Sequence, residues 1–213
     1  MINIAVIDYG LGNTKSICSA LEKNGVHVTL SSNRDKILLS DGVILPGVGA
    51  FSHGMDKLMS QKIDTLIYEF VDTGKPLLGI CLGMQMLFEE STEFGISKGL
   101  SLIPGKVQRL ENPLEGLEKL PHVSWSGIYK NKIVDWKGTI LDSVDSGEDM
   151  YFVHSYYAMP ANSSDVLSLS RYADFEFCST VKHENIYGCQ YHPEKSAVAG
   201  LRIINNFISK CKG

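Results

Sequence analysis

The sequence predicts an α/β fold: a single domain, residues 1–213, in which helices flank a central, mostly parallel sheet. In the first half, short apolar runs alternate with amphipathic helical segments, a pattern typical of parallel strands joined by crossover helices. From residue 105 to residue 190 the pattern changes to short β-rich pieces without a long amphipathic helix. We expect these pieces to form antiparallel hairpins that extend the sheet. With 213 residues, of which 44% are hydrophobic, the chain can bury one substantial core.

The first elements follow from the apolar runs and their boundaries. Residues 3–7 are predicted to form a buried strand. Asn13 is placed to cap a helix that ends at residues 24–25, where an Asn-Gly pair stands. Two further apolar runs, at residues 26–30 and 42–45, predict the next strands.

A second amphipathic helix precedes the middle of the chain. Its apolar residues have the i, i+3, i+4, i+7 spacing of one helical face: Ile63, Leu66, Ile67 and Phe70. Gly74 ends this helix just before Pro76, and the apolar residues that follow predict another strand.

In the second half we expect strands at residues 151–157, 166–172 and 175–181, and an apolar stretch at 186–191. A closing helix is predicted to begin near Ser196. Its buried face is expected to consist of Leu201, Ile204, Phe207 and Ile208.

A lone cysteine, Cys81, stands between Gly79 and Gly83 where an apolar strand passes into a helix. This pattern is typical of a nucleophile elbow, because the glycines relieve crowding around a sharply turned nucleophile. The backbone amides that open the next helix can face an oxyanion on the substrate. Cys81 is therefore a candidate nucleophile for acyl chemistry, and it needs a base elsewhere in the chain.

The candidate base is His192, which follows the apolar stretch 186–191, and Glu194 stands two residues later across a proline. The imidazole would take the thiol proton and later protonate a leaving amine, while the carboxylate orients the ring. Taken singly, a cysteine between glycines can be a packing residue and a histidine beside proline a loop residue. The combination favours a catalytic triad.

A glycine turn, residues 47–49, follows the apolar strand 42–45. By itself the motif indicates a tight strand-to-helix connection. Beside a cysteine elbow, it is better interpreted as an oxyanion-hole segment. The sequence Asp8-Tyr9-Gly10-Leu11-Gly12-Asn13 lacks the third glycine of a dinucleotide-binding loop, with Lys15 in its place, so no such cofactor is expected.

Composition excludes several classes of function. The net charge of −4 and pI near 5.9 provide no basic stripe for nucleic acid. No apolar run approaches the roughly 20 residues that span a bilayer, so we expect no membrane association and a cytoplasmic location. Five cysteines without a CxxC pair suit a reducing compartment. The six histidines lack ligand spacing, so no metal is expected.

Four motifs resemble those of the class I (triad) glutamine amidotransferases and stand in that family's order and spacing: Pro46-Gly47-Val48-Gly49, the segment from Gly79 to Gln85, Tyr151-Phe152-Val153-His154-Ser155-Tyr156 and His192-Pro193-Glu194-Lys195-Ser196. The chain is most similar to the glutaminase subunits of imidazole glycerol phosphate synthase. The resemblance covers nearly the whole chain and implies a flavodoxin-like fold.

The resemblance also implies the chemistry. Cys81, His192 and Glu194 would hydrolyse glutamine, and the ammonia would pass through a channel to a β/α-barrel cyclase in a heterodimer that serves histidine biosynthesis. No cofactor is implied. The remaining implied roles are an oxyanion hole of Val48, Gly49 and Leu82, a glutamine site of Gly49, Gln85, Glu93, Ser155 and Tyr156, and a partner interface of Asn13, Trp125 and Lys195. Glu93 could equally be a solvated charge, Gln85 a residue that faces a helix neighbour, and Asn13 a simple helix cap.

One segment departs from the resemblance. The synthase subunits usually carry Pro-His-x-Gly-Trp-Asn, whereas this chain has Ser124 and Ser126 on either side of Trp125. The departure keeps open a paralogous glutaminase that feeds another synthase, such as one for acetamidino sugars. More distant alternatives are a stand-alone γ-glutamyl thiol hydrolase and a partner-binding module without activity.

Overall fold

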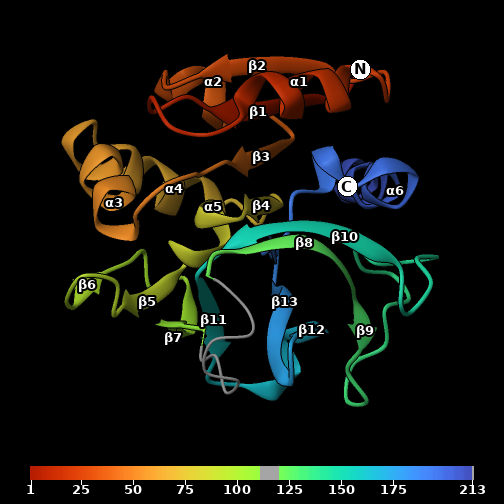
Figure 1. The fold of residues 1–213 in the computed structure, drawn as a ribbon. Coiled ribbons are helices and arrows are strands. Elements are labelled where there is room, and N and C mark those ends of the chain that lie inside the picture. The colour runs from red at the N-terminus through yellow and green to blue at the C-terminus, as the bar shows by residue number, and fades with distance from the viewer. Residues whose placement is uncertain (111–119, 213) are drawn as a thin grey trace.

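The computed structural model describes residues 1–110 and 120–212 (Figure 1). Parts of the predicted domain 1–213 and of the β-rich region 105–190 therefore lie outside the described residues. The central sheet has eight strands in the order β2 (His27–Ser31), β1 (Asn3–Ile7), β3 (Gly42–Leu45), β4 (Leu77–Ile80), β14 (Ile186–Cys189), β13 (Phe175–His183), β12 (Val166–Tyr172) and β9 (Tyr129–Lys130). The first five are parallel and the last three join antiparallel. The order of the parallel strands is that of flavodoxin-like folds, as predicted.

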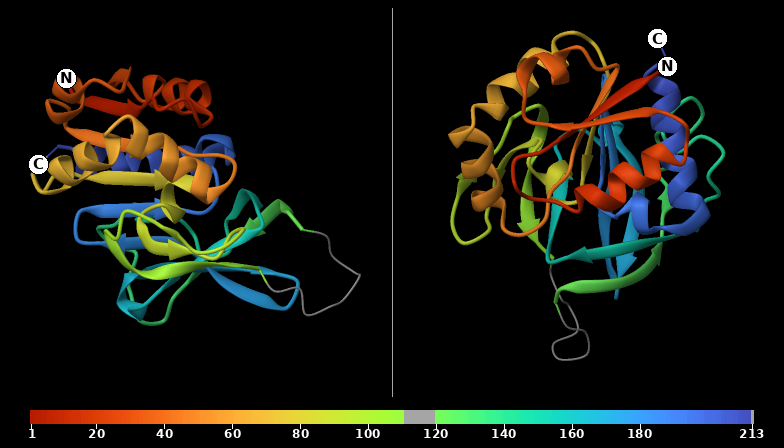
Figure 2. Two further views of the ribbon diagram at one scale, coloured as in Figure 1. Left: turned by 90° about the vertical axis from the view of Figure 1, so that its left-hand side faces the viewer. Right: turned by 90° about the horizontal axis from the view of Figure 1, so that it is seen from above.

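Helices cover both faces of this sheet (Figure 2). One face carries α1 (Thr14–Glu22) and α6 (Ala197–Lys210), and the other carries α2 (Arg34–Leu38), α3 (Phe51–Ser60) and α4 (Ile63–Val71). Each face has its own apolar core, which includes Ile17, Ile204 and Phe207 on the first side and Phe51, Ile67 and Phe70 on the second. The single turn α5 (Leu82–Gln85) follows β4 at the carboxyl edge of the sheet.

Two smaller sheets lie beside the C-terminal strands of the central sheet. One pairs β10 (Asp149–His154) with β8 (His122–Gly127), and the other has the order β11 (Tyr156–Pro160), β7 (Ile103–Arg109), β5 (Phe88–Ser91) and β6 (Ser97–Lys98). Two 3₁₀ turns, η1 (Ser163–Asp165) and η2 (Pro193–Lys195), complete the described elements.

These sheets correct two expectations. The single strand predicted at 151–157 is wrong, because the chain leaves one sheet and enters another at Ser155. Of the predicted antiparallel strands, those at 166–172 and 175–181 do extend the central sheet, whereas β7, β8, β10 and β11 do not. A strand pattern shows which side chains share a face, but it does not show which neighbour the strand pairs with.

Individual elements agree with most of the sequence pattern. All four apolar residues predicted on α4 are buried. Asn13 does occupy the N-cap position of α1, but its side chain makes no capping hydrogen bond. On α6, Leu201 is only partly buried, in contrast to Ile204. In the described residues, no helix combines the length and apolar character required to cross a membrane.

Candidate active site

The predicted catalytic segments meet at the carboxyl edge of the central sheet. The strands β3, β4 and β14 are parallel neighbours, so the residues that follow them emerge side by side. Cys81 directly follows β4, the Val48-Gly49 turn follows β3, and His192 follows β14. The Cys81 amide donates to the Cys189 carbonyl at 2.7 Å, which ties the elbow to the adjacent strand.

The backbone at Cys81 has the strained geometry expected of a nucleophile elbow. Its φ of +55° and ψ of −111° lie in a region that L residues rarely adopt. The flanking glycines permit it: a Cβ on Gly79 would stand 2.7 Å from the Gly83 carbonyl oxygen, and a Cβ on Gly83 would collide with the Leu45 carbonyl oxygen. The elbow therefore requires glycine on both sides for steric reasons.

His192 and Glu194 form a buried pair behind the nucleophile. The His192 Nδ1 donates to Glu194 Oε1 at 2.9 Å, and their side chains are 3% and 0% exposed. Because Nδ1 carries the donated proton, the neutral ring has its lone pair on Nε2. That nitrogen is buried and has no aligned hydrogen-bond partner. It is the atom able to take a proton from the thiol.

The electrostatics of this pair favour a charged imidazole. Burial alone lowers the pKa of His192, but interactions with Cys81 and Glu194 outweigh burial and hold the pKa well above its usual value. Since Nε2 makes no aligned hydrogen bond, we attribute the contribution of Cys81 to charge rather than to a formed bond. The arrangement stabilises an imidazolium, as proton transfer from a cysteine requires.

A pocket of about 280 Å³ opens in front of Cys81. It is lined by every residue predicted for the oxyanion hole and the glutamine site, together with five others. The full set is Val48, Gly49, Cys81, Leu82, Gln85, Glu93, Pro121, Val153, His154, Ser155, Tyr156 and His192. Glu194 does not line this pocket, because it lies behind His192. The structure thus brings the predicted residues together around one cavity.

Two of these residues also brace the pocket. The Gln85 side-chain amide donates to the Tyr156 carbonyl at 2.8 Å and to Gln190 Oε1 at 3.0 Å. The Glu93 carboxylate accepts from the Phe51 amide at 2.6 Å, at the start of α3. Both side chains therefore hold protein segments in addition to facing the cavity.

The predicted interface residues lie outside the pocket. Trp125 is 50% exposed on β8, and its ring centroid is 6.0 Å from that of Tyr151. Lys195 Nζ is 5.7 Å from the same Tyr151 ring, so these three side chains form one cluster. Asn13 is the N-cap residue of α1. It follows Gly12, where a Cβ would stand 2.8 Å from the Pro46 side chain.

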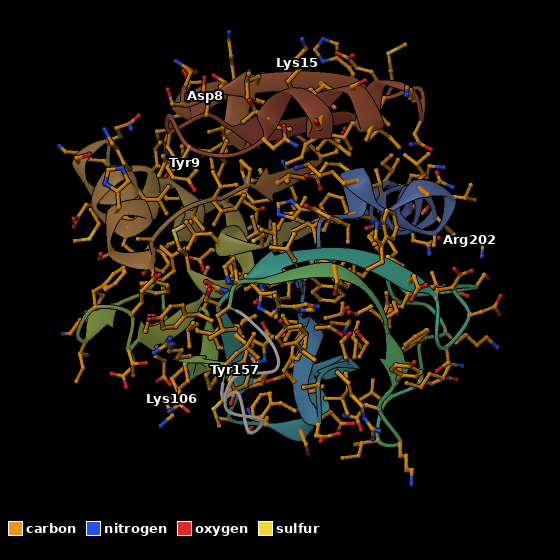
Figure 3. All side chains as sticks on the ribbon, viewed as in Figure 1. Asp8, Tyr9, Lys15, Lys106, Tyr157 and Arg202 are labelled. Atoms are coloured by element: carbon orange, nitrogen blue, oxygen red, sulfur yellow. The ribbon has the colours of Figure 1, made fainter. Side chains whose placement is uncertain are left out.

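Three contacts of the site escaped the sequence analysis. Gln190 Nε2 lies 3.9 Å from Cys81 Sγ, and the thiol lies 3.8 Å from the Val153 carbonyl oxygen. The Tyr9 hydroxyl, buried between the end of β1 and α3 (Figure 3), donates to the Pro46 carbonyl at 2.7 Å and so braces the turn that carries Val48. Residues 186–191 are all buried, so no alternation of buried and exposed side chains marks Gln190, and no local signal marks Tyr9.

No group of three or more His, Cys, Asp or Glu side chains among residues 1–110 and 120–212 is arranged to hold a metal ion. The site instead offers a thiol, an imidazole, a carboxylate and a small polar cavity. This set can perform nucleophilic acyl transfer without a metal ligand set.

Comparison with known proteins gives a consistent result. The profile of the glutamine amidotransferase class-I family matches residues 5–211. The imidazole glycerol phosphate synthase subunit HisH 1 of Legionella pneumophila (strain Paris) is 41% identical over 211 residues, which are 98% of this chain and 99% of the relative. The HisH subunit of Archaeoglobus fulgidus is 45% identical over 210 residues, again 98% and 99% of the two chains.

Solved structures share the fold at lower identity. A crystal structure of a glutamine amidotransferase has a TM-score of 0.73 at 15% identity and covers 99% of both chains. The glutaminase domain of CTPS from Trypanosoma brucei, solved with acivicin, has a TM-score of 0.69 at 15% identity and covers 99% of this chain and 94% of its own. The chain belongs to the class-I glutamine amidotransferases and, within them, to the family of the imidazole glycerol phosphate synthase subunits HisH.

Proposed function

We propose that this protein is the glutaminase subunit of an imidazole glycerol phosphate synthase. It hydrolyses glutamine to glutamate and ammonia and supplies the ammonia to a cyclase subunit in histidine biosynthesis. The observation that carries the proposal is the buried His192–Glu194 pair beside Cys81, at the wall of a cavity of about 280 Å³. The five cysteines are free thiols, which fits the cytoplasm as its place of action.

The geometry supports a two-step mechanism. His192 Nε2 takes the thiol proton, and the Cys81 sulfur attacks the side-chain amide carbon of glutamine. Amides of Val48, Gly49 and Leu82 stabilise the oxyanion, and His192 returns the proton to the leaving nitrogen as ammonia departs. A water molecule, deprotonated by His192, then attacks the thioester, and glutamate leaves as the thiol is restored.

The cavity provides matching contacts for the amino-acid part of glutamine. The Ser155-Tyr156 backbone forms one wall, and Gln85 holds that wall in place through the Tyr156 carbonyl. Glu93 also lines the cavity, and the negative charge of its carboxylate suits the α-ammonium group of the substrate. We therefore assign Gly49, Gln85, Glu93 and the Ser155-Tyr156 segment to glutamine binding.

The outer face of β8 provides a surface for the cyclase. Val123 and Trp125 share this face and are 53% and 50% exposed, and both Trp125 and Lys195 lie near the Tyr151 ring. Exposed aromatic side chains beside a cation are typical of protein interfaces. We assign this face, with Asn13 near the first turn of α1, to contact with a β/α-barrel partner.

The glycines around Val48 suggest how activity is controlled. Gly49 has a φ of +95°, so the peptide before it has conformational freedom that other residues lack. Val48 is 40% exposed at the pocket mouth. We propose that the Val48 amide points into the oxyanion hole only when the partner has bound its ligand.

The decisive experiment measures glutamate release from glutamine by the purified chain, alone and with the cyclase subunit from the same organism plus its nucleotide substrate. Strong stimulation by the cyclase supports the proposal. Brisk activity of the chain alone would instead indicate an independent hydrolase. Silence in both conditions, with the cyclase active on ammonium salts, would indicate a different synthase. Cys81→Ser should abolish glutamate release while ammonia-dependent cyclase activity persists.

A further inference from the structure

Two buried histidines that the catalytic mechanism does not use lie beside the pocket: His154 lines it, and His122 contacts His154 from outside the lining. His122 Nδ1 and His154 Nε2 are 3.0 Å apart, and the side chains are 0% and 6% exposed. His154 Nδ1 reaches the Tyr156 carbonyl at 2.9 Å. At the other end, His122 Nε2 lies 2.7 Å from Ser124 Oγ and 3.0 Å from Ser126 Oγ. We call these four side chains the histidine relay.

Hydrogen-bonding chemistry assigns a direction to the relay. A carbonyl oxygen only accepts, so His154 Nδ1 carries a proton and donates it to Tyr156. In a neutral ring, His154 Nε2 then accepts, and His122 Nδ1 must be the donor. His122 Nε2 in turn accepts from a serine hydroxyl. One tautomer of each ring satisfies every contact.

If His154 were protonated on both nitrogens, its Nε2 would donate to His122, and the direction of the hydrogen bonds between the rings would be reversed. Burial opposes this charged state. Burial lowers the pKa of His122 to about 4 and that of His154 to about 3, and the neighbouring His122 and His192 act on His154 in the same sense. Both rings are therefore neutral near pH 7. Stacking fixes the plane of His122, whose centroid lies 4.2 Å from Tyr172 and 5.1 Å from Phe152.

The relay ends at a carbonyl oxygen, so it cannot pass a proton to the substrate. Its effect is to hold a peptide group. The Tyr156 carbonyl accepts from both His154 and Gln85, which uses both of its lone pairs. This carbonyl stands where β10 gives way to β11, at the break between two sheets. Two side chains therefore hold this carbonyl, while the backbone of the same segment pairs with β7 through Tyr156 opposite Arg109 and through the Leu110 amide, which donates to the Ser155 carbonyl at 2.9 Å.

We propose that the histidine relay positions the Ser155-Tyr156 wall of the pocket for the glutamine substrate by holding the Tyr156 carbonyl in place. The relay residues are positioning residues, since His154 touches the pocket while the others act through it. This inference rests on the proposed glutaminase function. It adds that the affinity for glutamine depends on the hydroxyl groups of Ser124 and Ser126, although neither serine lines the cavity.

The tautomers of His122 and His154 can be determined without an activity assay. Nitrogen-15 NMR of the full chain, labelled at histidine, distinguishes a ring protonated on Nδ1 from one protonated on Nε2. We expect neutral, Nδ1-protonated rings for His122 and His154 at pH 7, assigned by loss of each signal in His122→Asn and His154→Asn. A ring protonated on Nε2, or on both nitrogens, would overturn the relay.

The positioning role is tested by glutaminase kinetics in the complex with the cyclase. His154→Ala should raise the KM for glutamine about tenfold, because the Tyr156 carbonyl keeps only the hydrogen bond from Gln85 and loses part of its orientation, with kcat nearly unchanged. His154→Asn retains a donor near the Nδ1 position and should recover much of the loss. A denaturant titration of each variant checks that it is folded.

The serines supply the sharper test, since their removal leaves both rings in place. Either hydroxyl can satisfy His122 Nε2, so Ser124→Ala and Ser126→Ala should each resemble the wild type, while the double variant should raise the KM about threefold. The matched control removes two exposed hydroxyls, Ser163 and Ser164, and should change nothing.

Two results would overturn the positioning role: a double serine variant equal to the control, or a loss confined to kcat. The proposed function fails separately, if the wild-type complex hydrolyses no glutamine. In that case the positioning of glutamine falls with it, whereas the NMR result still decides whether the relay exists.

Discussion

Replacement of Gly83 by alanine tests whether the nucleophile elbow depends on close backbone approach. Gly83 is the second residue of α5, and its Cα faces the end of β3. An added Cβ would collide with the Leu45 carbonyl oxygen and would stand 2.9 Å from the Leu45 carbonyl carbon and 3.2 Å from that of Pro46. All three atoms belong to the backbone of the neighbouring segment, so no side-chain rotation can relieve the contact.

The size of the effect follows from these distances. Carbon atoms in contact are normally about 3.5 Å apart or more, so the Leu45 carbonyl carbon alone requires α5 to move by roughly 0.6 Å, the difference between 3.5 and 2.9 Å. The collision with the Leu45 carbonyl oxygen requires a larger movement than this. Such overpacking destabilises a fold by about 1–3 kcal/mol. Displacement of a nucleophile by about 1 Å can lower catalysis about a hundredfold. We therefore expect a far larger loss of kcat/KM than of folded protein.

The assay combines glutaminase kinetics of the complex with urea unfolding of the same preparations. The matched control is Gly74→Ala, which has a φ of +77° but open space around the added Cβ. It should cost about 1 kcal/mol of stability through backbone strain alone and leave kcat/KM unchanged. If Gly83→Ala kept the kcat/KM of the control, the steric account of the elbow would be wrong.

Three further predictions concern charge and surface. Glu194→Gln should leave the fold intact but lower kcat about a hundredfold or more, because the imidazolium at His192 loses its buried counter-charge; rapid-mixing measurement of thioester formation checks this. The lowered pKa values of His122 and His154 mean that the unfolded chain binds more protons below pH 6.5, so stability should fall as pH drops toward 4, by about 2–3 kcal/mol per histidine at pH 4.5 in urea titrations. The raised pKa of His192 has the opposite sign: its contribution is complete below pH 6.5 and is lost as pH rises toward the folded value. Trp125→Ala should weaken cyclase binding about tenfold or more in calorimetry without a change in urea midpoint, and an unchanged affinity would exclude β8 from the interface.

Local sequence signals determined the parallel half of the fold and the catalytic candidates. The apolar runs and the helical spacing of Ile63 to Phe70 show which side chains are buried on folding. The structure agrees with these signals, because the predicted face of α4 is buried. The elbow at Cys81 is visible in sequence because its steric requirement falls on immediate neighbours, the glycines. His192 and Glu194 are likewise two residues apart, so their contact needs no tertiary information.

Tertiary structure alone decided how the pocket wall is built. The strand pattern at 151–157 identifies extended backbone, but the break at Ser155 arises because β10 and β11 find partners in different sheets. The contacts that hold this wall join residues far apart in the chain, such as Gln85 with Gln190 and His122 with His154. Buried polar groups must find partners wherever packing places them, and that placement depends on strand order and register, which a single sequence does not encode locally.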